Sequence, residues 1–302
     1  MSRKNQILLE SGTNELEILE FTIAGRFYGI NVAKIAELMK CHEVTPMPNS
    51  NPYVEGIFNP RGTIMTLINL PAYMGQAESE NPSNDIFVIT NFNNIFSAFR
   101  VHTVEEIHRL SWTAIEKPDG AIYGGDEGLA TGIARIGDRL VTIIDFEKIM
   151  QDISPSTGIQ IEEVEKLGER TRSDAHILMA EDSPILNKLL VEALTKAEYS
   201  NLTMCTNGEE AWNTLQQYKG TGMPIENFVR LVITDIEMPK MDGHRLLKLI
   251  REDDELKSLP VVIFSSLIDE AMRIKGEALG ATAQLAKPEI GKLIGLVDEH
   301  IL

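Results

Sequence analysis

The chain has 302 residues, enough for two domains, and its hydrophobic content of 43% is ordinary for a globular protein. Its formal net charge of −17 argues against binding to nucleic acid or to anionic membrane surfaces, which select basic proteins. The first residues, MSRKNQILLE, lack the apolar core of a secretory signal, and no run approaches the ~18 apolar residues of a membrane span. We therefore expect a cytoplasmic protein without membrane insertion.

The first half of the chain consists of short β-type runs separated by glycine, proline and asparagine. This pattern predicts an all-β barrel or sandwich. The runs cover residues 16–24, 26–32, 43–47, 63–70, 85–92, 95–101, 128–136 and 138–146. Residues 34–40 (KIAELMK) are expected to form a helix, and residues 49–56 a proline-led turn. No phosphate-binding loop, nucleophile elbow or zinc-protease motif occurs in this half, which favours a binding module over a catalytic domain.

Five stretches of this half resemble the CheW-type chemotaxis coupling domain. They are Phe27–Ile30, Pro46–Pro48, Val54–Ile57, Arg61–Gly62 and Leu140–Asp145. The resemblance implies a coupling domain over residues 1–153, built as a double β-barrel. It also implies that Arg61 and Gly62 contact a partner protein.

Residues 154–173 are expected to link two domains. The segment begins with SPSTG and continues with a highly charged stretch. Ile161, Val164 and Leu167 have the spacing of one face of a short amphipathic helix, so we expect a helical spacer.

The last third of the chain carries polar residues directly after apolar β-type runs. The runs and the residues that follow them are 176–180 before Glu181, 231–234 before Asp235, 261–264 before Ser265 and 283–286 before Lys287. Helical patterns alternate with the runs, which predicts a doubly wound α/β domain with five parallel strands. Because ligands bind at the carboxyl ends of parallel strands, these side chains should converge there.

The residue types at this edge favour magnesium and phosphoryl chemistry. Mg²⁺ prefers oxygen ligands, which Glu181, Asp182, Asp235 and the backbone carbonyl of Glu237 can supply. Asp235 could act as a nucleophile that forms an acyl phosphate. Residues expected to contact the phosphoryl group are Lys287 as a point charge, Ser265 as a hydrogen-bond donor and Ser266 as a small neighbour.

Residues 174–302 resemble the receiver domain of two-component systems, which has the CheY-like fold. The stretch from Asp235 to Gly243 has the pattern D-x-x-M-P-x-M-D-G, and the acidic pair, the two serines and the lysine stand where that family has its own. The resemblance implies transfer of a phosphoryl group from a histidine kinase to Asp235, giving a 4-aspartylphosphate. Gln284 stands where the family commonly has an aromatic residue. We therefore expect the conformational readout to run through residues 265–269 and the adjoining helix, and not through a side chain of the fifth strand.

A coupling domain followed by a receiver domain resembles the CheV type of chemotaxis protein. This resemblance implies an adaptor between methyl-accepting chemoreceptors and the histidine kinase CheA, located at chemoreceptor arrays. Phosphorylation would serve adaptation or drain phosphate from the kinase. Apart from its own phosphorylation and dephosphorylation, we expect no enzymatic activity.

Two alternatives differ in class. A magnesium-dependent phosphohydrolase with an aspartate nucleophile would need a second Asp two residues after Asp235, where this chain has Glu237. A response regulator with a different output, such as transcription, would need a basic DNA-binding module, whereas this chain is acidic and its first half is rich in β-type runs.

Overall fold

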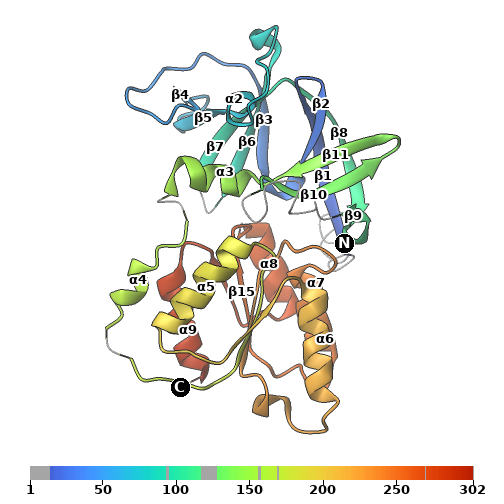
Figure 1. Ribbon diagram of the computed structural model, residues 1–302, viewed down its shortest axis with the longest axis vertical. Helices are drawn as coiled ribbons and strands as arrows, with labels where there is room; N and C mark the ends of the chain where they lie inside the picture. Colours follow the sequence, from blue (N-terminus) through green and yellow to red (C-terminus); the bar gives the residue numbers. More distant parts are fainter. Residues whose placement is uncertain are drawn as a thin grey trace. The chain divides into compact units, whose positions relative to one another are not determined.

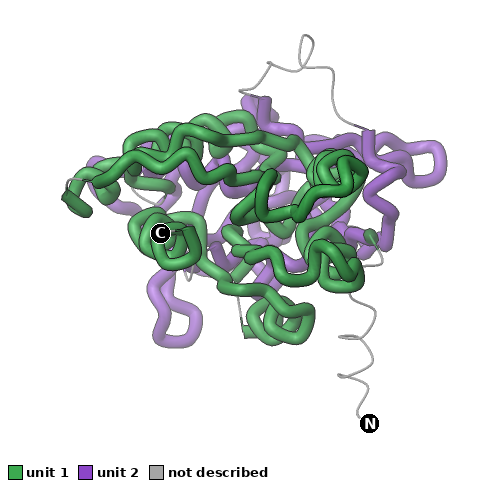
Figure 2. Tube along the Cα trace, turned by 90° about the horizontal axis from the view of Figure 1, so that it is seen from below, with its two compact units in different colours: residues 1–14, 156–302 green, residues 15–155 purple. Residues whose placement is uncertain are grey.

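The computed structural model describes residues 14–92, 95–116, 128–155, 158–168, 170–268 and 270–301. The chain divides into two compact units, one of residues 15–155 and one of residues 156–302 together with 1–14 (Figure 2). Each unit contains hydrophobic cores of its own.

The first unit is built on two β-sheets, which confirms the expected β-rich fold. Its described residues form one sheet in the order β8-β1-β2-β11-β10-β9 and another in the order β3-β6-β7-β5-β4 (Figure 1). The first sheet contains β1 (Glu15–Ile23), β2 (Arg26–Asn31), β8 (Thr103–Ser111), β9 (Ile115–Glu116), β10 (Ala130–Ile136) and β11 (Arg139–Ile144). The second contains β3 (Ile35–Lys40), β4 (Val54–Phe58), β5 (Met65–Asn69), β6 (Ile86–Phe92) and β7 (Ile95–Val101).

Two short helices follow strands of these sheets. Helix α2 (Leu70–Tyr73) continues from β5, and helix α3 (Phe146–Ile153) follows β11. Asp145 caps α3 by accepting hydrogen bonds from the backbone N–H groups of Glu147 and Lys148. The ring of Phe146 then packs edge to face against Phe99, with 4.6 Å between the ring centroids.

The prediction of a helix over residues 34–40 is wrong. Residues 32–34 form a single 3₁₀ turn, and Ile35–Lys40 form strand β3. Side-chain exposure alternates at every residue of β3, so its pattern has the period of a strand. A segment this short is ambiguous between the two periods, and its antiparallel pairing with β6 decides the outcome.

The sequence pattern also missed strands β4 and β8 and the two-residue strand β9. Strand β8 lies at an edge of its sheet and is rich in charged residues, so it lacks a clear apolar alternation. Strand β4 falls partly within the expected turn at 49–56. Gly56 in β4 has φ +151°, and a Cβ there would lie 2.2 Å from the carbonyl oxygen of Thr45. The close approach of these two segments therefore requires glycine at position 56.

The second unit is a parallel α/β domain, as expected. Its strands have the order β13-β12-β14-β15-β16 and are all parallel. They are β12 (Ile177–Ala180), β13 (Leu202–Cys205), β14 (Leu231–Thr234), β15 (Val261–Ser265) and β16 (Ala283–Ala286). The helices are α5 (Pro184–Lys196), α6 (Gly208–Lys219), α7 (Gly243–Glu252), α8 (Glu270–Leu279) and α9 (Ile290–Ile301).

The helices of this unit cover both faces of the sheet. Residues of α5 and α9 share one hydrophobic core, and residues of α6 and α7 belong to the other (Figure 1). The strand order reverses direction between β12 and β14. A crevice at such a reversal, at the carboxyl ends of the strands, is where ligands bind in doubly wound sheets.

The segment expected as a spacer packs onto this α/β unit. It contains helix α4 (Glu162–Glu165), and the side chains of Ile159 and Val164 are buried in the core formed by α5 and α9. Lys196 of α5 pairs with Glu165 at 2.9 Å. Of the three residues whose spacing predicted one helical face, Ile161 and Val164 pack against this core, whereas Leu167 is 41% exposed.

Candidate functional site

The three acidic residues singled out in the sequence meet at the carboxyl ends of β12 and β14. Glu181, Asp182 and Asp235 each offer a carboxylate oxygen, and these oxygens lie within 4.8 Å of one another. The backbone sets this convergence. The N–H of Asp235 donates to the carbonyl of Ala180 at 2.9 Å, which continues the parallel pairing of the two strands into the site.

Lys287 reaches the same acids from the end of β16. Its Nζ lies 2.8 Å from Asp235 Oδ2 and 3.0 Å from Glu181 Oε2. All three side chains are buried. A single buried ammonium thus offsets part of the negative charge of two buried carboxylates, which would otherwise repel each other strongly.

The burial of Glu181 changes its titration. Removal from water is the largest influence and raises the pKa of Glu181; Lys287 lowers it, and the charges of Asp235 and Asp182 raise it. Together they leave the pKa of Glu181 above its ordinary value, at about 8. One Glu181 oxygen, Oε1, accepts a hydrogen bond from the backbone N–H of Ser183 at 3.1 Å. Full deprotonation of the cluster is therefore unfavourable. A bound divalent cation would stabilise the fully charged form.

The donor set fits Mg²⁺. Three carboxylates from two neighbouring strand ends offer hard oxygen ligands, and partly exposed Asp182 leaves the cluster open to water molecules, which Mg²⁺ retains. Glu237 lies two residues after Asp235, in the loop between β14 and α7.

The loop from Asp235 to Asp242 is held tightly. Asp235 Oδ1 accepts a hydrogen bond from the backbone N–H of Ile236 at 2.6 Å, and Asp242 caps α7 through the N–H of Arg245 at 2.7 Å. A Cβ on Gly243 would lie 1.9 Å from the carbonyl oxygen of Asp235. Only glycine permits this approach, which fixes the backbone of Asp235 against the start of α7.

The two serines lie at the end of β15. Ser265 is fully buried and Ser266 nearly so. Ser265 Oγ accepts a hydrogen bond from the backbone N–H of Leu267 at 3.3 Å, which leaves its O–H proton available to donate. The backbone N–H of Lys287 donates to the carbonyl of Ser265 at 3.2 Å, so strand pairing joins the serine and the lysine.

Sequence reasoning missed Asn187. Its side-chain Nδ2 donates to the backbone carbonyl of Glu181 at 3.0 Å, from one turn into α5. This bond ties the acidic pair to the helix that follows it. An asparagine within a helical pattern carries no local signal of such a contact, so only the fold reveals it.

Arg61 and Gly62 lie in the loop between β4 and β5 of the first unit. The Arg61 guanidinium donates to both carboxylate oxygens of Glu37, at 2.8 and 3.3 Å. The Arg61 side chain is 73% exposed, and Gly62 has φ +87°, a conformation that favours glycine. Arg61 and Glu37 therefore form an ion pair at the surface. Glu37 belongs to β3, and Arg61 belongs to the β4–β5 loop.

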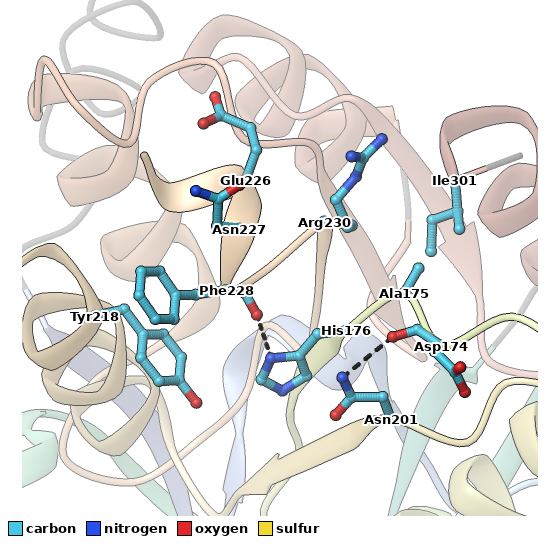
Figure 3. A pocket seen from close by; sticks show the side chains of 10 residues that line it. All are labelled: Asp174, Ala175, His176, Asn201, Tyr218, Glu226, Asn227, Phe228, Arg230 and Ile301. Carbon is cyan, nitrogen blue, oxygen red and sulfur yellow. Dashed lines mark hydrogen bonds between the residues drawn. The ribbon is translucent and has the colours of Figure 1, made fainter. Parts of the chain in front are cut away.

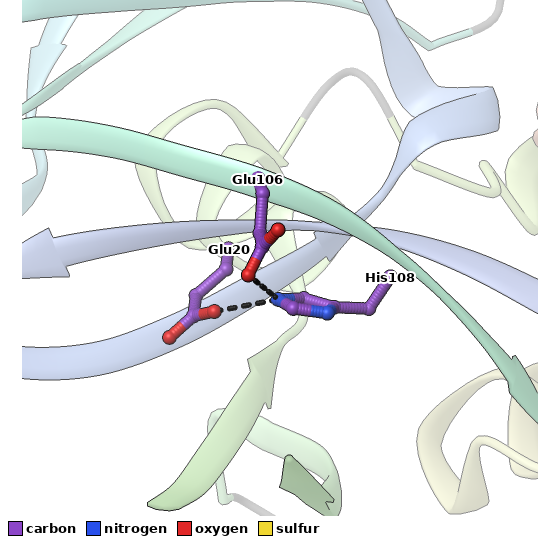
Figure 4. Close-up of side chains that lie close together, drawn as sticks. All are labelled: Glu20, Glu106 and His108. Atoms are coloured by element: carbon purple, nitrogen blue, oxygen red, sulfur yellow. Dashed lines mark hydrogen bonds and ion pairs between the residues drawn. The ribbon is translucent and has the colours of Figure 1, made fainter. Parts of the chain in front are cut away.

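A second group of potential metal ligands, Glu20, Glu106 and His108, lies in the first unit (Figure 4). His108 Nε2 lies 2.6 Å from one oxygen of fully buried Glu20, and Arg139 lies 3.3 Å from the other. The arginine already supplies positive charge to the buried carboxylate. We therefore assign this group as an ionic network that links β1, β8 and the start of β11.

A cavity of about 500 Å³ lies at the opposite end of the second unit's sheet from the acids (Figure 3). His176, Asn201 and Arg230, which line it, directly precede β12, β13 and β14. Both ring nitrogens of His176 are engaged, one with the carbonyl of Phe228 and the other with the hydroxyl of Thr203. This cavity is separate from the acidic cluster, because it lies at the amino ends of the strands.

Comparisons with known proteins divide the chain in the same way. A family model described as a CheW-like domain matches residues 17–154, and one described as a response regulator receiver domain matches residues 177–298. Within the described part of the chain, no helix has the length and apolar character needed to cross a membrane.

Two relatives match the chain over nearly its whole length, and a third matches less than half of it. Chemotaxis protein CheV3 of Helicobacter pylori is 31% identical over 286 residues, which cover 91% of each chain. Chemotaxis protein CheV2 of the same organism is 28% identical over 298 residues, covering 92% of each chain. Chemotaxis protein CheW of Klebsiella aerogenes is 28% identical over 135 residues, covering 44% of this chain and 81% of its own.

Proposed function

The chain belongs to the CheV-type chemotaxis proteins, and from this premise we propose that phosphorylation of Asp235 regulates how its CheW-like domain couples chemoreceptors to a histidine kinase. The observation that carries this proposal is the geometry around Asp235. One of its carboxylate oxygens is paired with Lys287. Carboxylate oxygens of two further acids, Glu181 and Asp182, lie close enough to an oxygen of Asp235 to bind the same metal ion.

Asp235 acts as the phosphoryl acceptor. One of its oxygens forms a bond to phosphorus while the bond from phosphorus to the donor histidine nitrogen breaks, and that nitrogen keeps the electron pair and takes up a proton. Glu181, Asp182, Asp235 and the carbonyl of Glu237 would hold Mg²⁺, whose charge, when the ion is bound, offsets that of the transferring oxygens.

Three other residues of this chain act on the phosphoryl group. Lys287 moves from its pairing with the carboxylates to the phosphoryl oxygens as a point charge. Ser265 donates its free O–H proton to one of those oxygens. Small Ser266 leaves room for the group beside the end of β15.

The CheW-like domain supplies the coupling contacts. Its partners are methyl-accepting chemoreceptors and the kinase CheA, and exposed Arg61, with Gly62 shaping its loop, belongs to one of these interfaces. The protein is then a scaffold at chemoreceptor arrays rather than a catalyst, and its only chemistry is gain and loss of its own phosphoryl group. Phosphorylation serves adaptation or drains phosphate from the kinase.

The alternative of a phosphohydrolase is not favoured. That class needs a second aspartate two residues after the nucleophile, where this chain has Glu237. The match to a coupling domain in the first unit also favours an adaptor.

A co-assembly experiment tests the proposal. Receptor signalling fragments and CheA are sedimented with the full-length chain, with and without beryllofluoride and Mg²⁺. We expect the amount of chain in the complex to change with beryllofluoride for the wild type and to stay constant for Asp235→Asn. Equal co-assembly of the wild type under both conditions would contradict regulation by phosphorylation.

A further inference from the structure

Helix α8 is anchored to its unit by few buried residues. Among its described residues only Gly276 is buried, whereas α7 buries Gly243, His244, Leu246, Leu247 and Ile250. Met272 and Leu279 of α8 are partly buried against the core. Because α8 follows the segment after Ser265, whatever fixes α8 also restricts that segment.

Gln284 of β16 makes a specific contact with α8. Its Nε2 donates a hydrogen bond to the backbone carbonyl of Arg273 at 2.8 Å, and its side chain is almost entirely buried. A carbonyl oxygen can only accept, so the amide nitrogen, and not the amide oxygen, must face the carbonyl of Arg273. The amide therefore has one orientation at this contact.

Gly276 makes room for this amide. A Cβ built on Gly276 would lie 2.2 Å from Gln284 Oε1 and 2.8 Å from its Nε2. Any larger residue at 276 would thus occupy the place of the Gln284 side chain. Glycine is among the poorest helix formers, so the helix gives up local stability to accept the contact.

The contact also leaves one polar atom of Gln284 without a hydrogen bond within the described part of the chain. Gln284 Oε1 is buried and accepts no hydrogen bond from the described residues, which offsets part of the gain from the bond to Arg273. Opening the contact would expose Oε1 to water and release α8 from β16. A contact with these opposing contributions is suited to open when a modest new interaction competes with it.

We propose that Gln284 and Gly276 form a latch that holds α8 against β16 and so sets how readily residues 266–268 move toward a phosphoryl group on Asp235. The link to the phosphoryl group rests on the proposed function. The latch itself is a positioning device and touches no reacting atom. The latch gives Gln284 a role in the readout, which was not expected from the sequence.

A double-mutant cycle on the full-length chain tests the latch by hydrogen exchange of the α8 amides. Gln284→Ala should speed their exchange about fivefold, as expected for loss of one hydrogen bond. Gly276→Ala should also speed exchange in the wild type, because the new methyl group displaces Gln284. In the Gln284→Ala background the same substitution should slow exchange, because only the better helix propensity of alanine remains.

Gly295→Ala in α9 is the matched control, since a Cβ there meets no atom within 4 Å. It should slow exchange in α9 in both backgrounds. If Gly276→Ala also slows exchange in both backgrounds, the latch is refuted.

Beryllofluoride affinity tests the link to the site. With the latch removed, Gln284→Ala should bind beryllofluoride in the presence of Mg²⁺ about fivefold more tightly than the wild type. Unchanged affinity in Gln284→Ala would overturn the link between latch and site. If the wild type binds no beryllofluoride, the proposed function fails, and with it this link, while the exchange cycle still decides whether the latch exists.

Discussion

The ammonium group of Lys287 lies 2.8 Å from Asp235 Oδ2, although 52 residues separate the two in sequence. Strands β14 and β16, which lie on either side of β15, bring them together. Both groups are buried, so each charge depends on the other. The Lys287 ammonium thus supplies positive charge to Asp235 and Glu181, the residues that would also bind a metal ion.

Lys287→Met should therefore destabilise the metal-free protein, by about 3 kcal/mol, because the buried Asp235 carboxylate loses its counterion. It should also bind Mg²⁺ more tightly, since the competing ammonium is gone. Urea unfolding with and without Mg²⁺ measures both effects. Exposed Lys292→Met is the control and should change the free energy of unfolding by less than about 0.5 kcal/mol. Equal Mg²⁺ stabilisation of wild type and Lys287→Met would contradict this account.

Binding of Mg²⁺ should strengthen as pH rises. Burial raises the pKa of Glu181 to about 8, so the metal-free protein holds a proton there at neutral pH. The metal must displace that proton, and its apparent affinity should rise up to about tenfold per pH unit until the raised pKa is passed. Calorimetric titrations at about pH 6.5 and about pH 8.5 measure the change. Glu181→Gln should bind more weakly and lose most of the pH dependence; a wild-type affinity independent of pH would contradict the prediction.

His244 should make the protein less stable in mild acid. Burial, and secondarily the charge of Lys275, lowers the pKa of His244 to about 3. In the unfolded chain the His244 imidazole is protonated near pH 6.5, whereas in the folded chain it is protonated only at far lower pH. As pH falls below about 6.5, the free energy of unfolding should therefore drop by up to about 1.4 kcal/mol per pH unit from this group.

Denaturation between about pH 7 and about pH 5 measures this slope. His244→Leu should reduce this slope by the contribution of about one proton. His42→Gln replaces an exposed histidine and should leave the slope unchanged. The same slope in wild type and His244→Leu would show that the buried imidazole is not its source.

Arg61→Glu should weaken one partner contact without unfolding the first unit. The guanidinium is 73% exposed, and loss of its pair with Glu37 should cost about 1 kcal/mol or less. A charge swap, Arg61→Glu with Glu37→Arg, restores the pair but presents reversed charges to a partner. Binding to receptor fragments and to CheA should stay weak in the swap if Arg61 contacts the partner. Full recovery of binding would instead give the pair a structural role.

The sequence predicted the second unit well for a physical reason. Parallel strands buried on both faces are continuous apolar runs, and the polar residue after each run is by topology a site residue. That is why Glu181, Asp235, Ser265 and Lys287 could be placed at one edge before their contacts were known.

Features that depend on distant partners could not be read in this way. Strand β3 has the composition of a helix, and only pairing with β6 makes it a strand. The partner of Arg61 lies 24 residues away, on that same misassigned segment. In the sequence, Gln284 stood out only because receiver domains commonly have an aromatic residue at this position. Its contact with Gly276 joins β16 to α8 and is seen only in the structure.

Phosphoryl transfer from labelled, phosphorylated CheA to the full-length chain tests the central claim most directly. The wild type should take up label only with Mg²⁺, Asp182→Asn should take up much less, and Asp235→Asn should take up none. Urea unfolding of each variant would show that the protein still folds. Full labelling of Asp235→Asn would contradict the assignment of Asp235 as the phosphoryl acceptor, and with it the regulation proposed for this adaptor.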